Sequence, residues 1–362
     1  MSNPKHRPPP SRWPFRKRFV YSGVGVLGGL LLLELLLRIF QFRYSTLPMS
    51  MEYVQWISAL GHSQEMPRGT FRINYRADPE YLWYPEPTAG FTNSLGFRGP
   101  EWAREKPAGV SRVVCLGDSC TATGEIPYAE RLQSCLNAAG QRFDVMNAGV
   151  GSWSSYQGRL LLGKKILDFK PDVVTIYFGW NDHWLAWSHS DRDLGKYLSG
   201  RARWINLVRK SRLAQALTWA ANRLLPRPDP RLRQPPLFRV SEEDYRKNLE
   251  AMVSSARTAG ALPILLTAPT TLHAEHGVTR YLVTQSRLFH NTQQINQVHD
   301  AYNNVVRNVA AATETPLIDL AQEFIYIEDK NDYISDGIHL TPRGAEWVAQ
   351  QICLAIRDRS RD

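Results

Sequence analysis

Short apolar runs alternate with longer amphipathic stretches from residue 110 to the end of the chain. The apolar runs are rich in Val, Ile and Leu and nearly continuous, which is typical of strands buried on both faces of a sheet. The longer stretches repeat their apolar residues every three or four positions, as helices do. The pattern predicts strands at 111–116, 143–148, 172–178, 262–268 and 316–320, and helices at 128–139, 156–167, 242–260, 301–313 and 343–356.

This strand–helix alternation predicts one α/β domain over residues 110–358. We expect a three-layer α/β/α sandwich in which five parallel strands form the middle layer and right-handed crossovers place helices on both faces. Ligands of such sheets bind beyond the carboxyl ends of the strands. Functional residues are therefore expected in the loops that follow the strands.

Two regions interrupt the alternation. Residues 41–109 are rich in Pro and aromatic residues, and the turn-bearing NSLGFRG at 93–99 indicates an accessory segment laid on the domain. Residues 183–241 form an insertion with an amphipathic helix or helix pair, followed by a Pro-rich stretch. We expect its apolar side chains to pack on the main domain as a lid or wall beside the site, with contact to lipid as the alternative. Those side chains are Trp204, Ile205, Leu207, Val208, Leu217, Trp219 and Leu224.

The stretch FVYSGVGVLGGLLLLELLLRIF, residues 19–40, is close to the roughly 20 apolar residues that cross a hydrocarbon core. Six Lys or Arg precede it, which predicts a cytoplasmic basic tail over residues 1–18 and an extracytoplasmic linker from residue 41. Glu34 is its one acidic residue, and Arg38 follows one turn later, where the two can pair. A cleaved signal peptide is the alternative, but no small-x-small pattern follows the apolar core. We therefore expect a single-pass membrane protein whose large domain is periplasmic or extracellular.

The formal net charge is +10 at pH 7, and most of the excess lies in residues 1–18 and 199–240. The second stretch carries ten Lys or Arg against the single acidic residue Asp229. Because the rest of the chain is mildly acidic, no nucleic-acid partner is expected. The basic part of the insertion either attracts an anionic substrate or anionic lipid headgroups, or is a solvated face.

The four cysteines leave the redox question open. Cys115 and Cys353 lie in apolar predicted elements, where a buried thiol is ordinary. Cys120 and Cys135 could pair in an oxidising compartment, which the sequence alone does not decide. HAEH at 273–276 lacks the i, i+4 spacing of paired His ligands on a helix and is expected to be a loop. We expect neither a metal nor an organic cofactor.

Polar blocks follow the first three predicted strands, and a fourth precedes the last helix. They are GDS at 117–119, NAGVGSWSSYQ at 147–157, GWND at 179–182 and SDGIHLTPRG at 335–344. Each block alone is more typical of a turn or a cap than of a site. Together they place a serine, a histidine, a carboxylate and an amide at one edge of the sheet, which are the parts of a hydrolytic serine site.

These four blocks, in this order, resemble those of the SGNH (GDSL) hydrolase family over residues 110–356. The resemblance implies a flavodoxin-like fold and acyl-ester hydrolysis. It makes Ser119 the nucleophile, His339 the base that takes its proton, and Asp336 the carboxylate that orients the imidazole.

The resemblance also implies an oxyanion hole made of the Ser119 backbone N–H, a backbone N–H of the second block and the Asn181 side chain. In the second block the family has a glycine where this chain has Ser152. The N–H survives that change, but the backbone conformation is costly for serine if the glycine is left-handed, and Gly151 could then supply the freedom. Supporting roles are expected for Gly117, Asp118, Gly151 and Asp182.

The sequence therefore predicts a membrane-anchored, extracytoplasmic serine esterase, with acyl and first of all O-acetyl esters of envelope glycans or lipids as substrates. An O-acyltransferase with the same triad is the first alternative, and a non-catalytic binding protein on the same fold is the second. An α/β-hydrolase is disfavoured because Ser119 lies in GDSCT and not in a Gly-x-Ser-x-Gly elbow. A flavodoxin-like nucleotide binder would not explain the serine, amide and Asp/His pair together.

Overall fold

The computed structural model describes residues 14–44, 75–138, 142–186, 189–225, 235–272, 277–285 and 289–359. Most of the expected basic tail, residues 45–74 of the linker and the HAEH loop lie outside the described residues. The chain divides into two compact units. One consists of Met1–Thr46 with Ile205–Arg227, and the other of Leu47–Trp204 with Pro228–Asp362.

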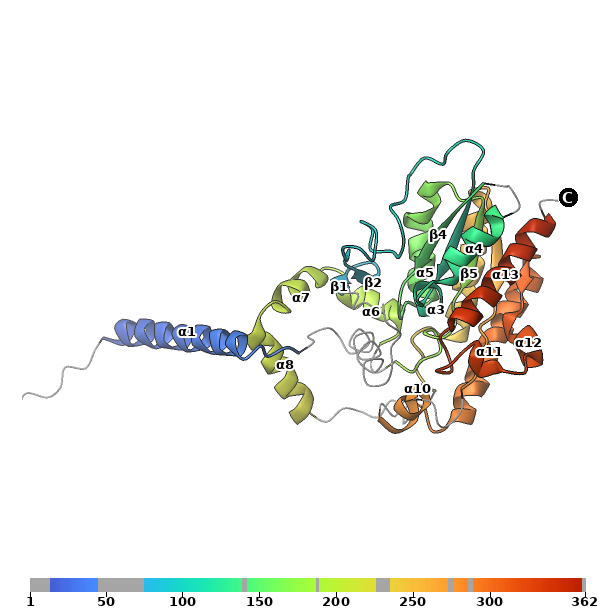
Figure 1. Cartoon of the computed structure of the whole chain (residues 1–362). Coiled ribbons are helices and arrows are strands. Elements are labelled where there is room, and N and C mark those ends of the chain that lie inside the picture. Colours follow the sequence, from blue (N-terminus) through green and yellow to red (C-terminus); the bar gives the residue numbers. More distant parts are fainter. Residues whose placement is uncertain are drawn as a thin grey trace, which may run out of the picture. The chain divides into compact units, whose positions relative to one another are not determined.

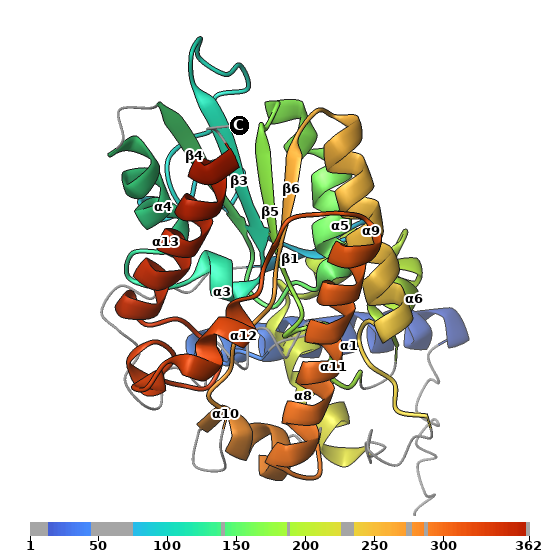
Figure 2. The same ribbon diagram turned by 90° about the vertical axis from the view of Figure 1, so that its right-hand side faces the viewer.

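The larger unit is built on a five-stranded parallel sheet with strand order β4-β3-β5-β6-β7. Figure 2 shows β4, β3, β5 and β6 side by side in this order. Its strands are β3 (Ser111–Gly117), β4 (Phe143–Gly149), β5 (Val173–Tyr177), β6 (Leu262–Leu266) and β7 (Leu317–Ile318). The central strands β3 and β5 are buried along almost their whole length, as their continuous apolar runs predict. The predicted α/β sandwich with five parallel strands is confirmed.

Helices cover both faces of this sheet (Figure 2). On one face α4 (Tyr128–Asn137) packs against α13 (Pro342–Arg359). On the other, α9 (Glu242–Thr258) contacts both α5 (Ser155–Lys164) and α11 (Thr292–Ala312). Helix α11 begins nine residues before the predicted helix, because Asn291 caps its first turn by accepting a hydrogen bond from the Gln294 N–H.

The remaining elements are short. An antiparallel hairpin of β1 (Tyr75–Asp78) and β2 (Leu82–Pro85), which the pattern did not predict, forms its own two-stranded sheet (Figure 1). The insertion holds α6 (Asp191–Leu198), α7 (Ala202–Val208) and α8 (Arg212–Leu224), and the other short helices are α3 (Ser119–Ala122), α10 (Gly277–Arg280) and α12 (Leu320–Glu323). Single turns of other helix types occupy Ile166–Phe169, Tyr281–Gln285, Phe324–Tyr326 and Lys330–Asp332.

The disulfide of this unit joins Cys135 of α4 to Cys353 of α13, with their Cα atoms 6.3 Å apart. Cys135 therefore does not pair with Cys120, a pairing that the sequence left open. Cys120 lies in α3, where its buried thiol contacts the Ile338 carbonyl oxygen at 3.5 Å. Cys135 pairs with Cys353 because α4 packs directly on α13. The apolar periodicity of the sequence does not show which helices pack together.

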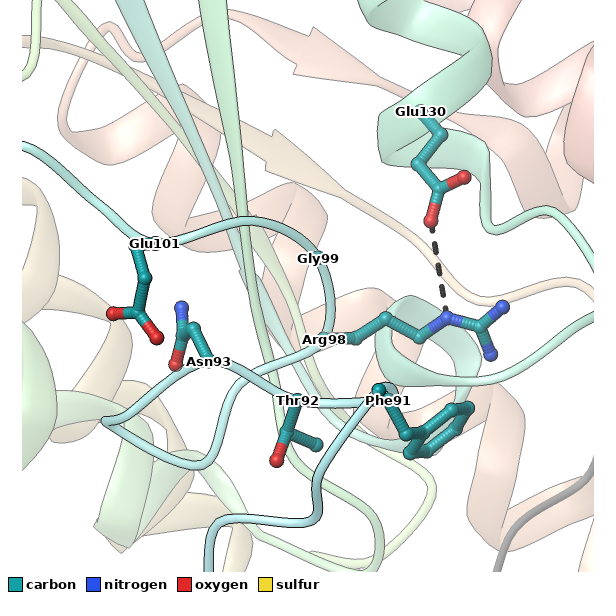
Figure 3. A pocket seen from close by; sticks show the side chains of 8 residues that line it. Phe91, Thr92, Asn93, Arg98, Gly99, Glu101 and Glu130 are labelled. Atoms are coloured by element: carbon teal, nitrogen blue, oxygen red, sulfur yellow. Dashed lines mark ion pairs between the residues drawn. The ribbon is translucent and has the colours of Figure 1, made fainter.

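The accessory segment at 93–99 braces the loop between α3 and α4. Arg98 donates hydrogen bonds to the carbonyl oxygens of Gly124 and Glu125 at 2.8 and 2.7 Å. Its guanidinium lies 4.7 Å from the centre of the Phe91 ring and 3.8 Å from Glu130 (Figure 3). These side chains line a surface hollow of about 330 Å³ that is separate from Ser119. The segment thus supports the chain just beyond the predicted nucleophile.

The smaller unit contains α1 (Phe15–Ile39) and α8, which pack against each other. Helix α1 is long and apolar enough to cross a membrane, and no residue in its most apolar stretch of 18 residues is buried. In the insertion, Leu207, Leu217 and Leu224 are 59, 63 and 80% exposed. Trp204, Val208 and Trp219 are exposed as well, and the packing of these side chains on the main domain stays a prediction.

Candidate active site

Ser119 is the first residue of α3 and is separated from the end of β3 by Asp118 alone. Asp118 caps this short helix by accepting a hydrogen bond of 2.9 Å from the Cys120 N–H. The turn requires glycine on both sides, since a Cβ on Gly117 would lie 2.7 Å from the Tyr177 carbonyl oxygen, and one on Gly149 would lie 2.5 Å from the Ala122 nitrogen. The glycines let α3 lie close to the ends of β3 and β4, which fixes Ser119 at the sheet edge.

Three predicted residues meet at this edge. The Ser119 Oγ lies 3.0 Å from His339 Nε2, and His339 Nδ1 lies 2.7 Å from Asp336 Oδ2. Because an ionised carboxylate can only accept, Nδ1 carries the proton and Nε2 accepts from the Ser119 hydroxyl. The other Asp336 oxygen accepts from the backbone N–H groups of Ile338 and His339 at 2.9 and 2.7 Å. These hydrogen bonds within the loop fix the Asp336 carboxylate against the imidazole.

The electrostatics of the pair keep Asp336 ionised and make His339 more basic. Burial favours the neutral acid, but the charge of His339 and the hydrogen bonds from the imidazole and the backbone lower the pKa of Asp336 to about 2. Burial likewise opposes protonation of His339, yet the charge and hydrogen bond of Asp336 outweigh it and raise the pKa of that imidazole. Both side chains stay partly accessible, at 27% for His339 and 41% for Asp336.

Asn181 lies beside the nucleophile turn. It follows β5, is 4% exposed, and donates a hydrogen bond of 3.1 Å from its amide nitrogen to Asp118 Oδ2. An amide has two N–H groups, so the second is available to a ligand at the sheet edge. Burial raises the pKa of Asp118 to about 6. Asp118 therefore connects the cap of α3 to the orientation of Asn181.

The second block contains one residue with a strained backbone conformation, Ser152. Ser152 has a φ of +62°, in the left-handed region that favours glycine. Gly151 is not among the residues with positive φ, so the freedom expected from it is not used. The structure gives no acceptor for the N–H of Ser119 or of Ser152 within the described residues. Both N–H groups thus keep their capacity to donate to an oxyanion.

Two residues that the sequence did not indicate hold this block. Arg239 donates to the Ser152 carbonyl oxygen at 3.0 Å and pairs with Asp191 at 2.9 Å. Asp191 also accepts a hydrogen bond of 2.7 Å from the Ser154 hydroxyl. The ion pair is buried, with side-chain exposures of 3% for Arg239 and 0% for Asp191. Both residues come from the two ends of the insertion, so the insertion and the second block form one polar network.

Asp182 supports the site indirectly. Its carboxylate accepts from the Ser155 N–H at 2.9 Å and from the Ser155 hydroxyl at 2.5 Å, at the start of α5. Burial raises the pKa of Asp182 to about 7. The hydrogen bonds of the Asp182 carboxylate go to Ser155 and not to Ser119 or His339, so Asp182 anchors the start of α5, which lies at the end of the second block.

The arrangement contains what acyl transfer through a serine requires. A hydroxyl lies within hydrogen-bond distance of a neutral imidazole nitrogen, and a carboxylate fixes the tautomer of that imidazole. Two backbone N–H groups and one side-chain amide stand at the same edge of the sheet. N–H donors of this kind stabilise the negative oxygen that forms when an ester carbonyl is attacked.

Comparison with known proteins agrees with this chemistry. The chain is 25% identical over 262 residues to an uncharacterised lipoprotein, YqeF, of Bacillus subtilis, covering 67% of this chain and 88% of the relative. It is 28% identical over 116 residues to an isoamyl acetate-hydrolysing esterase 1 homologue of Homo sapiens, covering 31% of this chain and 45% of the relative. A lipase/acylhydrolase structure from Enterococcus faecalis is similar with a TM-score of 0.45 and 20% identity, covering 69% of this chain and 96% of that one. Residues 115–347 match the GDSL-like lipase/acylhydrolase family, so the chain belongs to that family and is a hydrolase acting on ester bonds.

Proposed function

We propose that the protein is a membrane-anchored serine esterase that removes acyl groups, acetyl first of all, from glycans or lipids on the outer side of the cytoplasmic membrane. The observation that carries the proposal is the contact of 3.0 Å between Ser119 Oγ and His339 Nε2, with Asp336 bound to the other imidazole nitrogen. Ser119 and His339 lie 220 positions apart in the sequence, so the fold brings the hydroxyl to the imidazole from a distant segment.

The reaction proceeds in two halves. The Ser119 Oγ attacks the ester carbonyl carbon while His339 Nε2 takes the hydroxyl proton, and the carbonyl oxygen becomes an oxyanion held by the Ser119 and Ser152 N–H groups and the Asn181 amide. The C–O bond to the alcohol then breaks, and His339 gives its proton to the leaving oxygen.

A water molecule completes the cycle. His339 removes one of its protons as the water oxygen attacks the acyl-enzyme carbonyl, and the bond to Ser119 Oγ breaks as the proton returns to it. Carboxylic acid leaves and the free serine is restored. Throughout, Asp336 stays ionised and stabilises the imidazolium, which its low pKa of about 2 allows at neutral pH.

The location and the acyl group rest on separate support. An N-terminal apolar helix of 25 residues, the likeness to a lipoprotein and the Cys135–Cys353 disulfide all favour an extracytoplasmic domain. The human relative is named for the hydrolysis of an acetate ester, which supports a short acyl group. These observations support the proposal of an envelope deacetylase.

The decisive experiment compares the full chain in detergent micelles with its Ser119→Ala variant on 4-nitrophenyl acetate. Loss of nearly all activity is expected, because the nucleophile is gone. Ser254→Ala is the matched control, since Ser254 is exposed on α9 and its substitution should change nothing. Equal rates in Ser119→Ala and the wild-type chain, with labelling by a fluorophosphonate unchanged, would overturn the proposed nucleophile.

Acetylated glycans and lipids then test the substrate class. Release of acetate into water is expected when no acceptor alcohol is supplied. Transfer of the acetyl group to an added sugar hydroxyl, at the expense of acetate release, would instead identify an acyltransferase that uses the same serine.

A further inference from the structure

The single acidic residue of α1 is bound to the start of another helix. Glu34 Oε2 accepts from the Ser211 hydroxyl and the Leu213 N–H at 2.9 and 2.7 Å. Glu34 Oε1 accepts from the Arg212 N–H at 3.0 Å and from Arg38 one turn later at 2.8 Å. All the donors except Arg38 belong to the first turn of α8 or its cap.

This contact satisfies both partners. The first N–H groups of a helix have no acceptor within it, and the positive end of the helix dipole favours a carboxylate there. A carboxylate on an apolar membrane helix is costly unless it finds donors. Glu34 thus has a structural reason to be present, and that reason is α8.

Three further contacts fasten α8 to the carboxyl end of α1. Arg38 donates to the Lys210 carbonyl oxygen at 3.1 Å, and the Tyr44 N–H donates to the Gln215 side chain at 3.0 Å. The rings of Phe42 and Trp219 meet edge to face with centroids 6.3 Å apart. Helix α8 is therefore held where α1 ends (Figure 1).

The face of α8 that does not contact α1 is apolar and exposed. Leu217 and Leu224 are seven residues apart, on one side of the helix, and are 63% and 80% exposed. Leu225, which follows directly, is 66% exposed. Helix α8 has no acidic residue, and Arg212 and Arg223 are its charged residues. An apolar stripe with cationic flanks and a Trp is typical of helices that lie in a membrane interface.

The attachment point lies at the depth that such a helix occupies. Glu34 is five residues from the end of α1, which is about 7–8 Å along the axis. The polar layer between hydrocarbon and water is roughly 5–8 Å thick on each side of a bilayer. A helix whose first turn is bound to Glu34 therefore begins near the boundary between the acyl chains and the headgroups.

We propose that α8 is an interfacial helix that lies on the membrane surface, with Leu217 and Leu224 among the acyl chains and its arginines among anionic headgroups. The occupant of the exposed face is the bilayer that α1 crosses, so this inference rests on the proposed membrane anchoring. The chain would then be fixed to the membrane at two adjoining places.

The test uses the full chain in vesicles of phosphatidylcholine and phosphatidylglycerol, with an environment-sensitive fluorophore on single introduced cysteines. The native free thiols Cys115 and Cys120 are buried, so the wild-type chain gives the labelling background. Leu217→Cys and Leu224→Cys report on the apolar face of α8, and Arg223→Cys on its polar side. Leu354→Cys, exposed on α13, is the control in the large unit, and Leu30→Cys reports on α1 itself. Quenchers are lipids with nitroxide-bearing acyl chains, and iodide in the water.

Lipid quenching at positions 217 and 224 is expected to exceed that at 223 and 354 about twofold or more. A label at 30 that is quenched by lipid, with labels at 217 and 224 quenched by iodide, would overturn the interfacial helix and leave the anchor standing. Labels at 217 and 224 that neither quencher reaches would show that protein covers α8, either the large unit or a second copy, and this also overturns the proposal. A label at 30 that iodide quenches would overturn the membrane anchor itself.

Discussion

The guanidinium of Arg239 donates a hydrogen bond of 3.0 Å to the carbonyl oxygen of Ser152, the left-handed residue whose N–H we propose to face the oxyanion. Arg239 is held in turn by Asp191, 48 residues earlier in the chain. The insertion is thus connected at both ends to the loop that completes the oxyanion hole. The insertion would therefore affect the reaction by fixing the position of the Ser152 peptide group.

Replacement of Arg239 should impair both folding and catalysis, in separable ways. Arg239→Met leaves Asp191 buried without its partner, which should lower the free energy of unfolding by about 3–5 kcal/mol. In the double variant Arg239→Met/Asp191→Leu the charge is gone, so stability should return toward that of the wild-type chain. The kcat should stay reduced, by about tenfold, with KM nearly unchanged, because the Ser152 peptide has lost its donor.

Denaturant unfolding and ester hydrolysis measure the two effects. Arg246→Met is the matched control, since Arg246 pairs with Glu243 and Glu250 at the surface, where ion pairs contribute little. A double variant with wild-type kcat would show that the clamp on Ser152 has no part in the reaction.

Ser152→Gly should stabilise the protein. The left-handed conformation costs an ordinary residue about 1–2 kcal/mol, and glycine adopts it freely, so a net gain near 1 kcal/mol is expected after the entropy of the unfolded chain is counted. The backbone N–H is retained, so ester hydrolysis should change little.

Ser199 provides the comparison, because it is exposed with an ordinary φ of −54°. Ser199→Gly should be neutral or slightly destabilising, because there glycine only adds freedom to the unfolded chain. Thermal unfolding of the two variants side by side decides the matter, and a loss of stability in Ser152→Gly would refute the strain argument.

The pH dependence should report the imidazole. Hydrolysis needs neutral His339, and Asp336 raises the pKa of that imidazole above its ordinary value of 6.5. The kcat/KM should therefore fall on acidification with an apparent pKa above 6.5. The Asp336→Asn variant lacks the negative charge that raises the pKa of His339, so the acidic limb of the pH–rate profile should move to lower pH. The kcat of this variant should drop by about three to four orders of magnitude.

The competing source of an acidic limb is Asp118, whose buried carboxyl has a pKa of about 6. If His339 causes the acidic limb of the pH–rate profile, that limb should remain in Asp118→Asn. A pH-independent rate in that variant would contradict the assignment.

The free energy of unfolding should also depend on pH. The contribution of protonated His339 is complete below pH 6.5 and is lost as the pH rises through its folded pKa, and that of Asp336 is lost as the pH falls from 3.8 toward 2.

The disulfide should stabilise the large unit without affecting the chemistry. It closes a loop of 218 positions, so its removal in Cys135→Ala/Cys353→Ala should cost about 2–5 kcal/mol. Thiol counting in denaturant without reductant should find two reactive cysteines of four. Reductant should lower the Tm of the wild-type chain and leave that of the double variant unchanged; four reactive thiols would contradict the assigned bridge.

The pattern of apolar residues was enough to predict the sheet, because strands buried on both faces have continuous apolar sequences. It also predicted that Ser119, Asn181 and His339 would gather, since the loops at the carboxyl ends of parallel strands share one edge. The pairing of Arg239 with Asp191 could not be predicted, because no local sequence pattern connects residues at opposite ends of a long insertion. The bond from Glu34 to α8 and the Cys135–Cys353 bridge depend on which helices pack together, and amphipathic periodicity shows only that each has a face to bury.

The 220 positions between Ser119 and His339 matter during synthesis of the chain. A ribosome that has just added Ser119 still has to add most of the domain before it reaches Asp336 and His339. A nascent chain, or one that terminates early, therefore carries a hydroxyl with no base to activate it. Ester cleavage begins only after Asp336 and His339 have been made and have folded back against Ser119.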